Sequence, residues 1–395
     1  MSNNSHHHKR GSFTGSLGFV MAAAGSAVGL GNIWRFPYLA AKNGGGTFIF
    51  VYIILALTFG FTLLITEISM GRKTKQGPLT AYGMLNKKFA PTGFLAWIVP
   101  VIILPYYCTI GGWVLKYLFA FLTGDGVNSA ADGYFTGHIT SQWSPIIWMI
   151  IYMGLTAFVV ISGVNKGIEK YSRILMPILI VLIIGISFFS LTLHSTDADG
   201  ITRTGLEGLK IYLIPNFEGM TIKGFFLLLM DAIGQLFFSI SVAMGIMITY
   251  GSYVKDDVNL MSSINQIEFF DTLVALLAGL MIIPAIYTFS GIEGMSAGPG
   301  LMFVSLPKVF AAMGKVGIVI GILFFVTVTF AAITSSVSVM EAIVSGLMDK
   351  WKISRNKSVA LSLIYAIVVG IIVCLGYNVF YFELPLPNGS VAQVL

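Results

Sequence analysis

Residues 24–32 read AGSAVGLGN, and they lie inside an apolar run that extends from about residue 16 to residue 41. Three glycines and an asparagine are unusual in such a run, because each glycine costs a helix about 1 kcal/mol relative to alanine. Close packing through small residues would account for glycines four residues apart, but not for Gly31 followed by Asn32. The stretch therefore predicts an interrupted helix. Such an interruption frees carbonyl oxygens that suit a dehydrated sodium ion, and amide N–H groups that suit a carboxylate.

The run around this stretch is the first of nine. Hydrophobic residues make up 56% of the 395 positions and charged residues 10%, whereas an average soluble domain is about a quarter charged. The chain therefore needs lipid as a solvent. A membrane-spanning helix takes about 20 mostly apolar residues, and continuous apolar runs favour helices over barrel strands. The predicted spans are about 16–41, 44–71, 92–123, 143–162, 168–193, 224–251, 260–290, 315–348 and 358–379.

Basic residues are concentrated in alternate loops between these runs. The loops on the side of the N-terminus hold 15 of the 23 lysines and arginines, whereas residues 124–142 contain none. Because basic loops face the cytoplasm, we expect a multi-pass protein of the cell (inner) membrane with a cytoplasmic N-terminus. This placement of the net charge of +6 also decides against a nucleic-acid partner. No cleavable signal peptide is expected, because the first run is too long and more runs follow it.

Cysteines and histidines predict no metal centre. Cys108 and Cys374 lie inside apolar runs, so we expect no disulfide framework. His6 to His8 lie in a polar N-terminal tail. They could bind a metal, but a tag remnant or a disordered tail accounts for them more simply.

A second interruption is predicted within residues 235–245, QLFFSISVAMG. Taken alone the signal is weak, because a serine in a membrane helix usually bonds back to a carbonyl. The position of the stretch strengthens the prediction of a break. The sixth span is the first of a second set of five spans, as the first span is of the first set. Interrupted segments in matching positions of two halves indicate a transporter binding site. The nine spans are an odd number, and residues 384–390 read as a loop, so we expect a truncated chain.

Three motifs carry a family resemblance: GSAVGLGNIWRFPY at 25–38, NGGG at 43–46 and EISMGR at 67–72. From about residue 12 to residue 395 the chain resembles the neurotransmitter:sodium symporter family, and most of all its bacterial amino-acid transporter branch. The resemblance implies an all-α integral membrane fold of two inverted five-helix repeats with broken helices 1 and 6, here ending before helix 10. The expected parts are a cytoplasmic tail at 1–11, a transporter domain at 12–379 with repeats at about 12–193 and 224–379, and an extracellular loop remnant at 380–395.

The resemblance implies two sodium sites made of hard oxygen ligands. The implied ligands of the first are the carbonyl of Ala27, the side chain of Asn32, both oxygens of Ser239, and Asp271. Those of the second are the carbonyls of Gly25, Val28 and Ala331 and the hydroxyls of Thr334 and Ser335. Without the resemblance, the hydroxyls of residues 334–336 could equally close hydrogen bonds within their own helix.

Gly29 is informative about the substrate. Family members that carry monoamines have an aspartate at this position, whereas a glycine lets the substrate's own carboxylate approach the first sodium ion. Tyr107 matches the tyrosine that binds this carboxylate, although a lone membrane tyrosine is more often a packing residue. The implied pocket suits a hydrophobic or aromatic amino acid and is lined by Ser26, Ile103, Phe238, Ser241, Met244, Ser335 and Val339. Ala27, Gly31 and Ser239 complete the implied substrate contacts.

Asp271 departs from the asparagine that is more common in the family. A carboxylate beside sodium stays ionised, because the opposite charge favours the charged form. The other position at which bacterial relatives have a carboxylate is Ala275 in this sequence. We therefore expect Asp271, surrounded by Tyr52, Gln235 and Ser239, to supply the negative charge and to make transport independent of chloride.

The resemblance also implies gates. Arg35 and Phe238 would close the outer side, where the acidic partner of Arg35 belongs to the absent span 10. At the inner gate Arg10 would pair with Asp349, with Phe13 and Tyr253 nearby. Glu67 is an ionisable residue inside a span and by default marks function, but it could equally be structural and hold the unwound part of span 6.

These features predict sodium-coupled symport of an amino acid by alternating access. No paired catalytic carboxylates or metal-spaced His/Cys sets suggest an enzyme, and the glycines at 29 and 31 make a poor dinucleotide fingerprint. Two alternatives remain open from the sequence: a sensor that binds an amino acid with sodium without transporting it, and an inactive fragment. The expected partners are the amino acid and the lipid bilayer.

Overall fold

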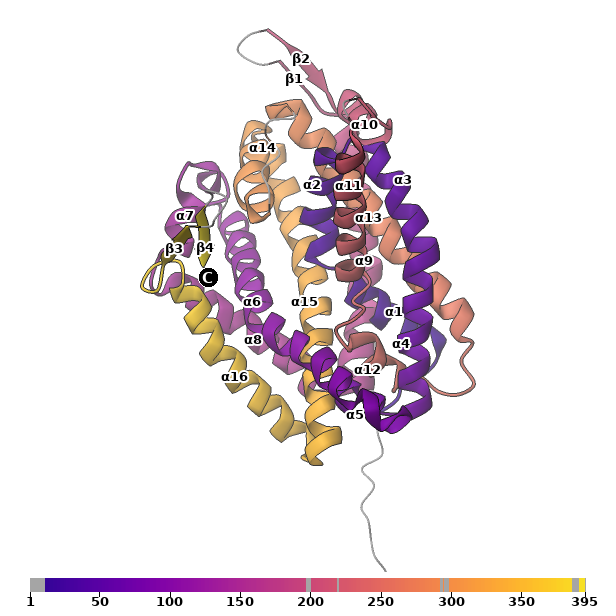
Figure 1. Ribbon diagram of the computed structural model, residues 1–395. Helices are drawn as coiled ribbons and strands as arrows, with labels where there is room; N and C mark the ends of the chain where they lie inside the picture. Colours follow the sequence, from indigo (N-terminus) through magenta and orange to yellow (C-terminus); the bar gives the residue numbers. More distant parts are fainter. Residues whose placement is uncertain are drawn as a thin grey trace, which may run out of the picture.

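Long helices run between two faces of the molecule (Figure 1). The computed structural model describes residues 11–196, 200–218, 220–291, 294, 298–385 and 391–394. The predictions for His6 to His8 and for Arg10 lie outside these residues. The end of the bundle at which residues 11–15 enter is called the N-terminal face below, and the other end is called the opposite face.

The number of spans agrees with the prediction. Among the described residues, eight helices are long and apolar enough to cross a membrane, and a bent pair makes a ninth span. Helices suit this role because all their backbone hydrogen bonds are internal. The eight are α3–η2–α4 (Gly46–Leu55, Ala56–Gly60, Phe61–Thr74), η3–α6 (Lys87–Phe89, Ala90–Leu122), α8 (Ser144–Ile161), η5–α9 (Val164–Glu169, Lys170–Leu191), α11 (Ile222–Ser239), α13 (Leu260–Ser290), α15 (Lys315–Trp351) and α16 (Arg355–Leu375).

The first span is broken, as its glycines predict. It consists of α1 (Ser16–Ala27), η1 (Gly31–Arg35) and α2 (Phe36–Lys42), with a bend of 52°. At the break, backbone hydrogen bonds give way to side-chain acceptors. The amide of Gly29 donates to Asn32 Oδ1 (3.2 Å), and the amide of Leu30 donates to the Tyr107 hydroxyl (3.4 Å). Gly31 and Asn32 therefore begin a new half-helix.

The sixth span is broken as well. It ends as a helix at Ser239 (α11) and resumes as α12 (Ile246–Gly251). Between them, Ser241, Ala243 and Gly245 have φ values of 54°, 61° and 70°. A left-handed conformation costs a non-glycine residue roughly 1–2 kcal/mol, and strain of this kind is typical of functional sites.

Short elements cover the two faces. At the N-terminal face lies α5 (Pro78–Leu85). The β1–β2 hairpin (His194–Thr196, Thr202–Thr204) projects from the opposite face (Figure 1). That face also carries η4 (Asn128–Ala130), α7 (Tyr134–Ile139), α10 (Gly205–Leu213), η7 (Leu301–Ser305) and α14 (Leu306–Ala312). Near the end of the chain, β3 (Phe382–Pro385) pairs with β4 (Val391–Val394).

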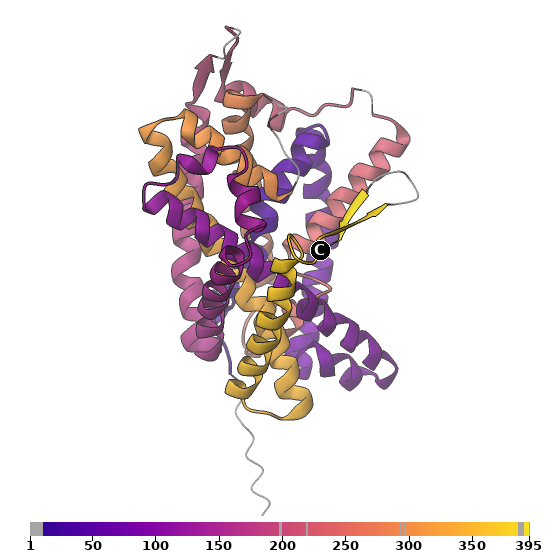
Figure 2. The same ribbon diagram turned by 90° about the vertical axis from the view of Figure 1, so that its left-hand side faces the viewer.

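Helix packing puts the two broken spans inside the bundle. The whole of α1 from Gly18 to Ala27 is buried, and α1 packs against α9, α13 and α15. The long helix α15 also contacts α6, α8 and α12. In contrast, α16 lies at the edge of the bundle against α6, α8 and α15, as Figures 1 and 2 show from two sides. The interruptions therefore face each other in the interior, flanked by α6 and α15.

Candidate transport site

A cavity of about 30 Å³ lies where the two breaks meet α6 and α15. All the predicted substrate-binding residues line it except Ser239, whose hydroxyl points to Asp271. The lining consists of Ser26, Ala27, Gly29, Leu30, Gly31, Asn32, Ile103, Tyr107, Phe238, Ser241, Met244, Ile246, Ser335, Ser338 and Val339.

Two glycines allow neighbouring groups to approach the backbone at this cavity. A Cβ atom on Gly29 would lie 2.6 Å from Ser335 Oγ and 3.2 Å from the Tyr107 hydroxyl. A Cβ atom on Gly31 would lie 2.5 Å from Phe238 Cδ1. Any side chain at these positions would collide with its neighbours. The half-helix that starts here also presents amide N–H groups, which favour an anionic group.

Asp271 is the centre of the first candidate ion site. Asn32 Nδ2 donates to Asp271 Oδ1 (2.8 Å), and Ser239 Oγ donates to both carboxylate oxygens (2.8 and 3.0 Å). The Tyr52 hydroxyl donates to Oδ2 (3.4 Å). All four residues are buried, and no ion pair joins Asp271 to a basic side chain within the described parts of the chain. A buried carboxylate without a cationic partner suits a bound cation.

The second candidate ion site lies where α1 ends against α15. Ser335 Oγ donates across to the carbonyls of Ser26 (3.0 Å) and Val28 (3.4 Å). Gly25 lies against Thr334, since a Cβ atom on Gly25 would be 3.3 Å from Thr334 Cβ. The Thr334 hydroxyl itself donates within its helix, to the carbonyls of Phe330 (3.0 Å) and Ala331 (3.1 Å). The two hydroxyls thus follow the two alternatives left open by the sequence: Ser335 crosses to span 1, and Thr334 bonds within its helix.

Comparisons with known proteins agree with this architecture. The model of the Sodium:neurotransmitter symporter family matches residues 10–142 and 136–385. The protein belongs to this family. A Bacillus subtilis protein described as a sodium-dependent transporter, YhdH, is 37% identical over 92% of this chain and 78% of its own length. The sodium-dependent transporter MJ1319 of Methanocaldococcus jannaschii is 33% identical over 95% of this chain and 77% of its own.

A solved structure extends the likeness to the fold. The crystal structure of MhsT in complex with L-phenylalanine has a TM-score of 0.82 and 35% identity, covering 94% of this chain and 82% of that chain. The present protein is therefore a multi-pass membrane protein of the bacterial branch with the inverted-repeat fold of that family. It is a sodium-dependent transporter and not an enzyme.

Three residues of the symporter's cavity, Leu30, Ile246 and Ser338, were missed from the sequence. Ser338 lies one helical turn beyond Ser335 on α15, and the Ser26 hydroxyl donates to its Oγ atom (2.6 Å). The Ser241 hydroxyl donates to the Ser26 carbonyl (3.2 Å). These three serines join spans 1, 6 and 8 beneath the cavity. The spacing of three between residues 335 and 338 could have indicated a shared helix face.

A wide vestibule leads from the opposite face of the symporter to the cavity. It has a volume of about 320 Å³ and is lined by Leu30, Trp34, Arg35, Tyr106, Tyr107, Ile110, Gly234 and Phe238. Leu30, Tyr107 and Phe238 line both spaces, so they form the partition between them. Phe238 thus lies where the predicted outer gate should be.

Arg35 lies in the vestibule wall. Its guanidinium donates to Gln235 Oε1 (3.1 Å) on α11. An acidic residue that the sequence reading did not use lies one turn earlier on that helix. Asp231 accepts hydrogen bonds from Lys42 Nζ and Asn43 Nδ2, both at 3.1 Å. This contact ties the part of span 1 after its break to the part of span 6 before its break.

Phe13, a residue of the predicted inner gate, lies at the N-terminal face. This side chain is buried, and its amide donates to the Tyr253 carbonyl (3.0 Å). The ring centroids of the two residues are 6.2 Å apart. Asp349 Oδ2 accepts a hydrogen bond from the Gly77 amide (2.6 Å). The predicted contact of Asp349 with Arg10 lies outside the described residues.

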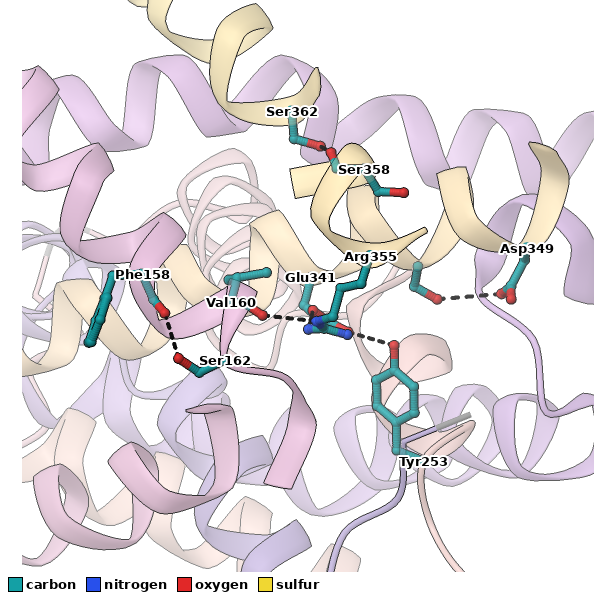
Figure 3. A network of polar contacts seen from close by, with 10 residues as sticks. Phe158, Val160, Ser162, Tyr253, Glu341, Asp349, Arg355, Ser358 and Ser362 are labelled. Atoms are coloured by element: carbon teal, nitrogen blue, oxygen red, sulfur yellow. Dashed lines mark hydrogen bonds and ion pairs between the residues drawn. The ribbon is translucent and has the colours of Figure 1, made fainter. Parts of the chain in front are cut away.

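A buried ion pair that the sequence reading missed lies beside Tyr253 (Figure 3). Arg355 of α16 contacts both carboxylate oxygens of Glu341 on α15, at 3.1 and 2.5 Å. The Tyr253 hydroxyl donates to the same carboxylate (2.6 Å), and Arg355 Nε donates to the Val160 carbonyl (2.9 Å). The signal was available, because Glu341 is the only acidic residue in the apolar run 315–348, and such residues are functional by default.

Glu67 holds the unwound part of span 6. Its Oε1 atom accepts a hydrogen bond from the Ala243 amide (2.7 Å), within the segment of left-handed backbone. Its Oε2 atom is buried and has no hydrogen-bond partner in the described part of the symporter. A carboxylate is a strong acceptor for a backbone amide that a helix would otherwise satisfy. The geometry supports the structural alternative for this residue.

Proposed function

We propose that the protein couples the entry of a hydrophobic or aromatic amino acid to sodium by alternating access. The observation that carries this proposal is the cavity between two broken helices, which has amide N–H groups and the Tyr107 hydroxyl on one side and apolar side chains on the other. A zwitterion with an apolar side chain complements both sides. Spans 1, 2, 6 and 7 would rock against spans 3, 4 and 8.

The absence of a side chain at Gly29 supports a substrate with a free carboxylate. That carboxylate would meet the amides of Gly29 and Leu30 and the Tyr107 hydroxyl. The rest of the lining is mainly apolar: Ile103, Phe238, Met244, Ile246 and Val339. Methionine adapts its shape to different guests. The L-phenylalanine in the MhsT structure supports an aromatic amino acid as the first guest to test.

Two sodium ions would bind next to this cavity. The first would take Ala27, Asn32, Ser239 and Asp271, and the second would take Gly25, Val28, Ala331, Thr334 and Ser335. Because the substrate carboxylate would complete the first set, sodium and substrate would each bind more tightly in the presence of the other. Such coupling is reciprocal by thermodynamic necessity. The inward sodium gradient then supplies the work of accumulation.

The Asp271 carboxylate supports transport without chloride. Asp271 supplies one negative charge beside the side chains of Asn32, Ser239 and Tyr52, so no external anion is needed to balance the first sodium ion. Replacing chloride with gluconate should leave uptake unchanged. Uptake that disappears in gluconate would contradict this part of the proposal.

The N-terminal face would lie in the cytoplasm. Basic residues at that face include Arg72, Lys73, Lys87, Lys88, Lys166 and Lys170. Cytoplasmic loops carry such an excess in membrane proteins generally. The vestibule above Phe238 would then open to the outside, and the protein would lie in the inner membrane of a bacterial cell.

Uptake into proteoliposomes tests the proposal. Vesicles loaded with potassium are diluted into sodium or potassium buffer with labelled L-phenylalanine, L-tyrosine, L-tryptophan or L-leucine. We expect accumulation of at least one of them in sodium only, abolished by a sodium ionophore. Sodium-dependent binding without accumulation would instead establish a sensor. Neither binding nor uptake of any of the four would contradict the proposal.

A further inference from the structure

A second open space lies at the N-terminal face, beside the start of span 5. It has a volume of about 340 Å³ and is separate from the cavity and the vestibule, with which it shares no residue. It is lined by Thr14, Asn165, Glu169, Lys170, Arg173 and Ile174. These residues come from the segment that leads into α1 and from η5 and α9. The space is therefore a groove at the membrane boundary between spans 1 and 5, and it is called the span 1–5 groove below.

The span 1–5 groove has an excess of positive charge. Lys170 and Arg173 line it and are exposed, and Lys166 lies one helical turn before Lys170. The acid of the groove, Glu169, is 3.7 Å from Arg173 but is itself buried. Neither Lys166 nor Lys170 takes part in an ion pair within the described parts of the chain. Lys170 and Arg173 thus give the groove two cations beside one buried carboxylate.

The Glu169 carboxylate is already occupied by protein donors. The amide of Thr14 donates to its Oε2 atom (2.9 Å), and the Thr14 hydroxyl contacts its Oε1 atom. Lys255 Nζ in turn donates to the Thr14 carbonyl (3.1 Å), which adds a further cation at the rim. The ammonium group of Lys170 and the guanidinium group of Arg173 keep N–H donors that no oxygen atom of the described residues accepts. An anion is the ligand that such donors suit.

An apolar stripe continues upward from these cations along α9. Ile174, Ile178 and Val181 follow Lys170 at spacings of four, four and three, so they share one helix face. All three are exposed, with 50%, 42% and 69% of their surfaces accessible. Because α9 is a membrane span, this stripe faces lipid chains. The same helix face therefore presents cations at the membrane boundary and aliphatic side chains within the bilayer.

We propose that the span 1–5 groove binds the headgroup of an anionic glycerophospholipid. The phosphodiester would accept hydrogen bonds from Lys170, Arg173 and the Asn165 amide, and an acyl chain would lie along Ile174, Ile178 and Val181. Basic pockets between membrane helices are known lipid headgroup sites. Isolated lysines at span ends only orient a protein, whereas here cations, an amide donor, a groove and an acyl track lie together.

A lipid in this groove would contact the segment that leads into α1 at the N-terminal face. Thr14 lines the groove and adjoins Phe13, whose amide donates to Tyr253. The bound headgroup would hold Arg173 and the first turn of α9 beside the contact between Thr14 and Glu169. Because the lipid binds the folded protein, it should also raise its unfolding temperature.

The test compares a double variant with a control of equal charge. Lys170→Gln/Arg173→Gln removes two cations from the groove, and Lys87→Gln/Lys88→Gln removes two exposed cations at the same face outside it. Retention of phosphatidylglycerol is measured by native mass spectrometry in a phosphatidylcholine background. Each basic residue at an anionic membrane surface raises the binding affinity roughly fivefold. We therefore expect phosphatidylglycerol to be retained about 25-fold more weakly by the first variant, and little change in the control.

Further arms of the test separate the possible ligands. Inorganic phosphate and glycerol 3-phosphate should displace phosphatidylglycerol only at far higher concentrations than dihexanoyl phosphatidylglycerol does. Equal potency would overturn the lipid and leave a free phosphate site. Equal losses in both double variants, or no loss in either, would also overturn the proposal. Should the groove variant fail to fold, two other variants replace it. Lys170→Arg/Arg173→Lys should retain phosphatidylglycerol like the parent protein, and Ile178→Ser should retain it more weakly.

Discussion

The replacement of Gly29 by alanine tests the geometry of the site most sharply. The new Cβ atom would lie 2.6 Å from Ser335 Oγ, closer than real contacts of this kind. The hydroxyl must rotate away, which breaks its hydrogen bonds to the carbonyls of Ser26 (3.0 Å) and Val28 (3.4 Å). Each such bond contributes about 1 kcal/mol net. Because one hydroxyl proton serves both carbonyls, the expected loss is about 1 kcal/mol, or roughly fivefold in affinity for the amino acid that binds.

The measurement is sodium-dependent binding of that amino acid to the purified variant. Gly185→Ala is the matched control, because Gly185 also lies within an apolar span and a Cβ atom there meets nothing within 4 Å. We expect Gly185→Ala to bind like the parent protein. Parental affinity in Gly29→Ala, or an equal loss in both variants, would refute the placement of the site at the first break.

Further expectations follow from the ion pairs and the titratable groups. Glu341→Gln leaves the guanidinium of Arg355 unpaired in a largely buried position and should lower the free energy of unfolding by about 3 kcal/mol, whereas Asp256→Asn, in an exposed pair, should change thermal unfolding little. Asp271→Asn should raise the sodium concentration for half-maximal binding roughly tenfold, and an unchanged sodium titration would remove this residue from the first ion site. Burial, together with the charge of Lys116, lowers the pKa of His138 to about 4, while an unfolded histidine titrates near 6.5. Between these pH values the unfolded chain binds a proton that the folded chain does not, so the free energy of unfolding should fall by about 2 kcal/mol from pH 7.5 to pH 5. Thermal unfolding of His138→Gln should lack this loss. An equal loss in the variant would exclude His138 as its cause.

Local sequence was sufficient for the spans and their breaks. The nine apolar runs are long enough to be recognised singly, and the glycines and asparagine of residues 24–32 favour a break wherever the helix lies. The break in span 6 carries a weaker signal, because Ser241 and Ala243 are forced into left-handed conformations by tertiary contacts, such as the Glu67 carboxylate on the Ala243 amide.

Residues joined across long sequence distances were harder to predict. Glu341 stood out as a lone acid, but nothing local pairs it with Arg355 across the turn between α15 and α16, or with Tyr253. Adjacent hydroxyls were no easier, since Thr334 bonds within its own helix while Ser335 crosses to span 1. The difference depends on which side of α15 faces α1, and the sequence of a helix buried on nearly all sides does not mark that side.

The most direct test is equilibrium binding of labelled L-phenylalanine, L-tyrosine, L-tryptophan and L-leucine to the purified protein in sodium and in potassium. Binding of at least one amino acid in sodium only, rising sigmoidally with sodium concentration, is the predicted result, because two ions would complete one site with the substrate. Equal binding in both salts, or no binding of any of the four in sodium, would contradict a sodium-coupled amino-acid site between the broken helices.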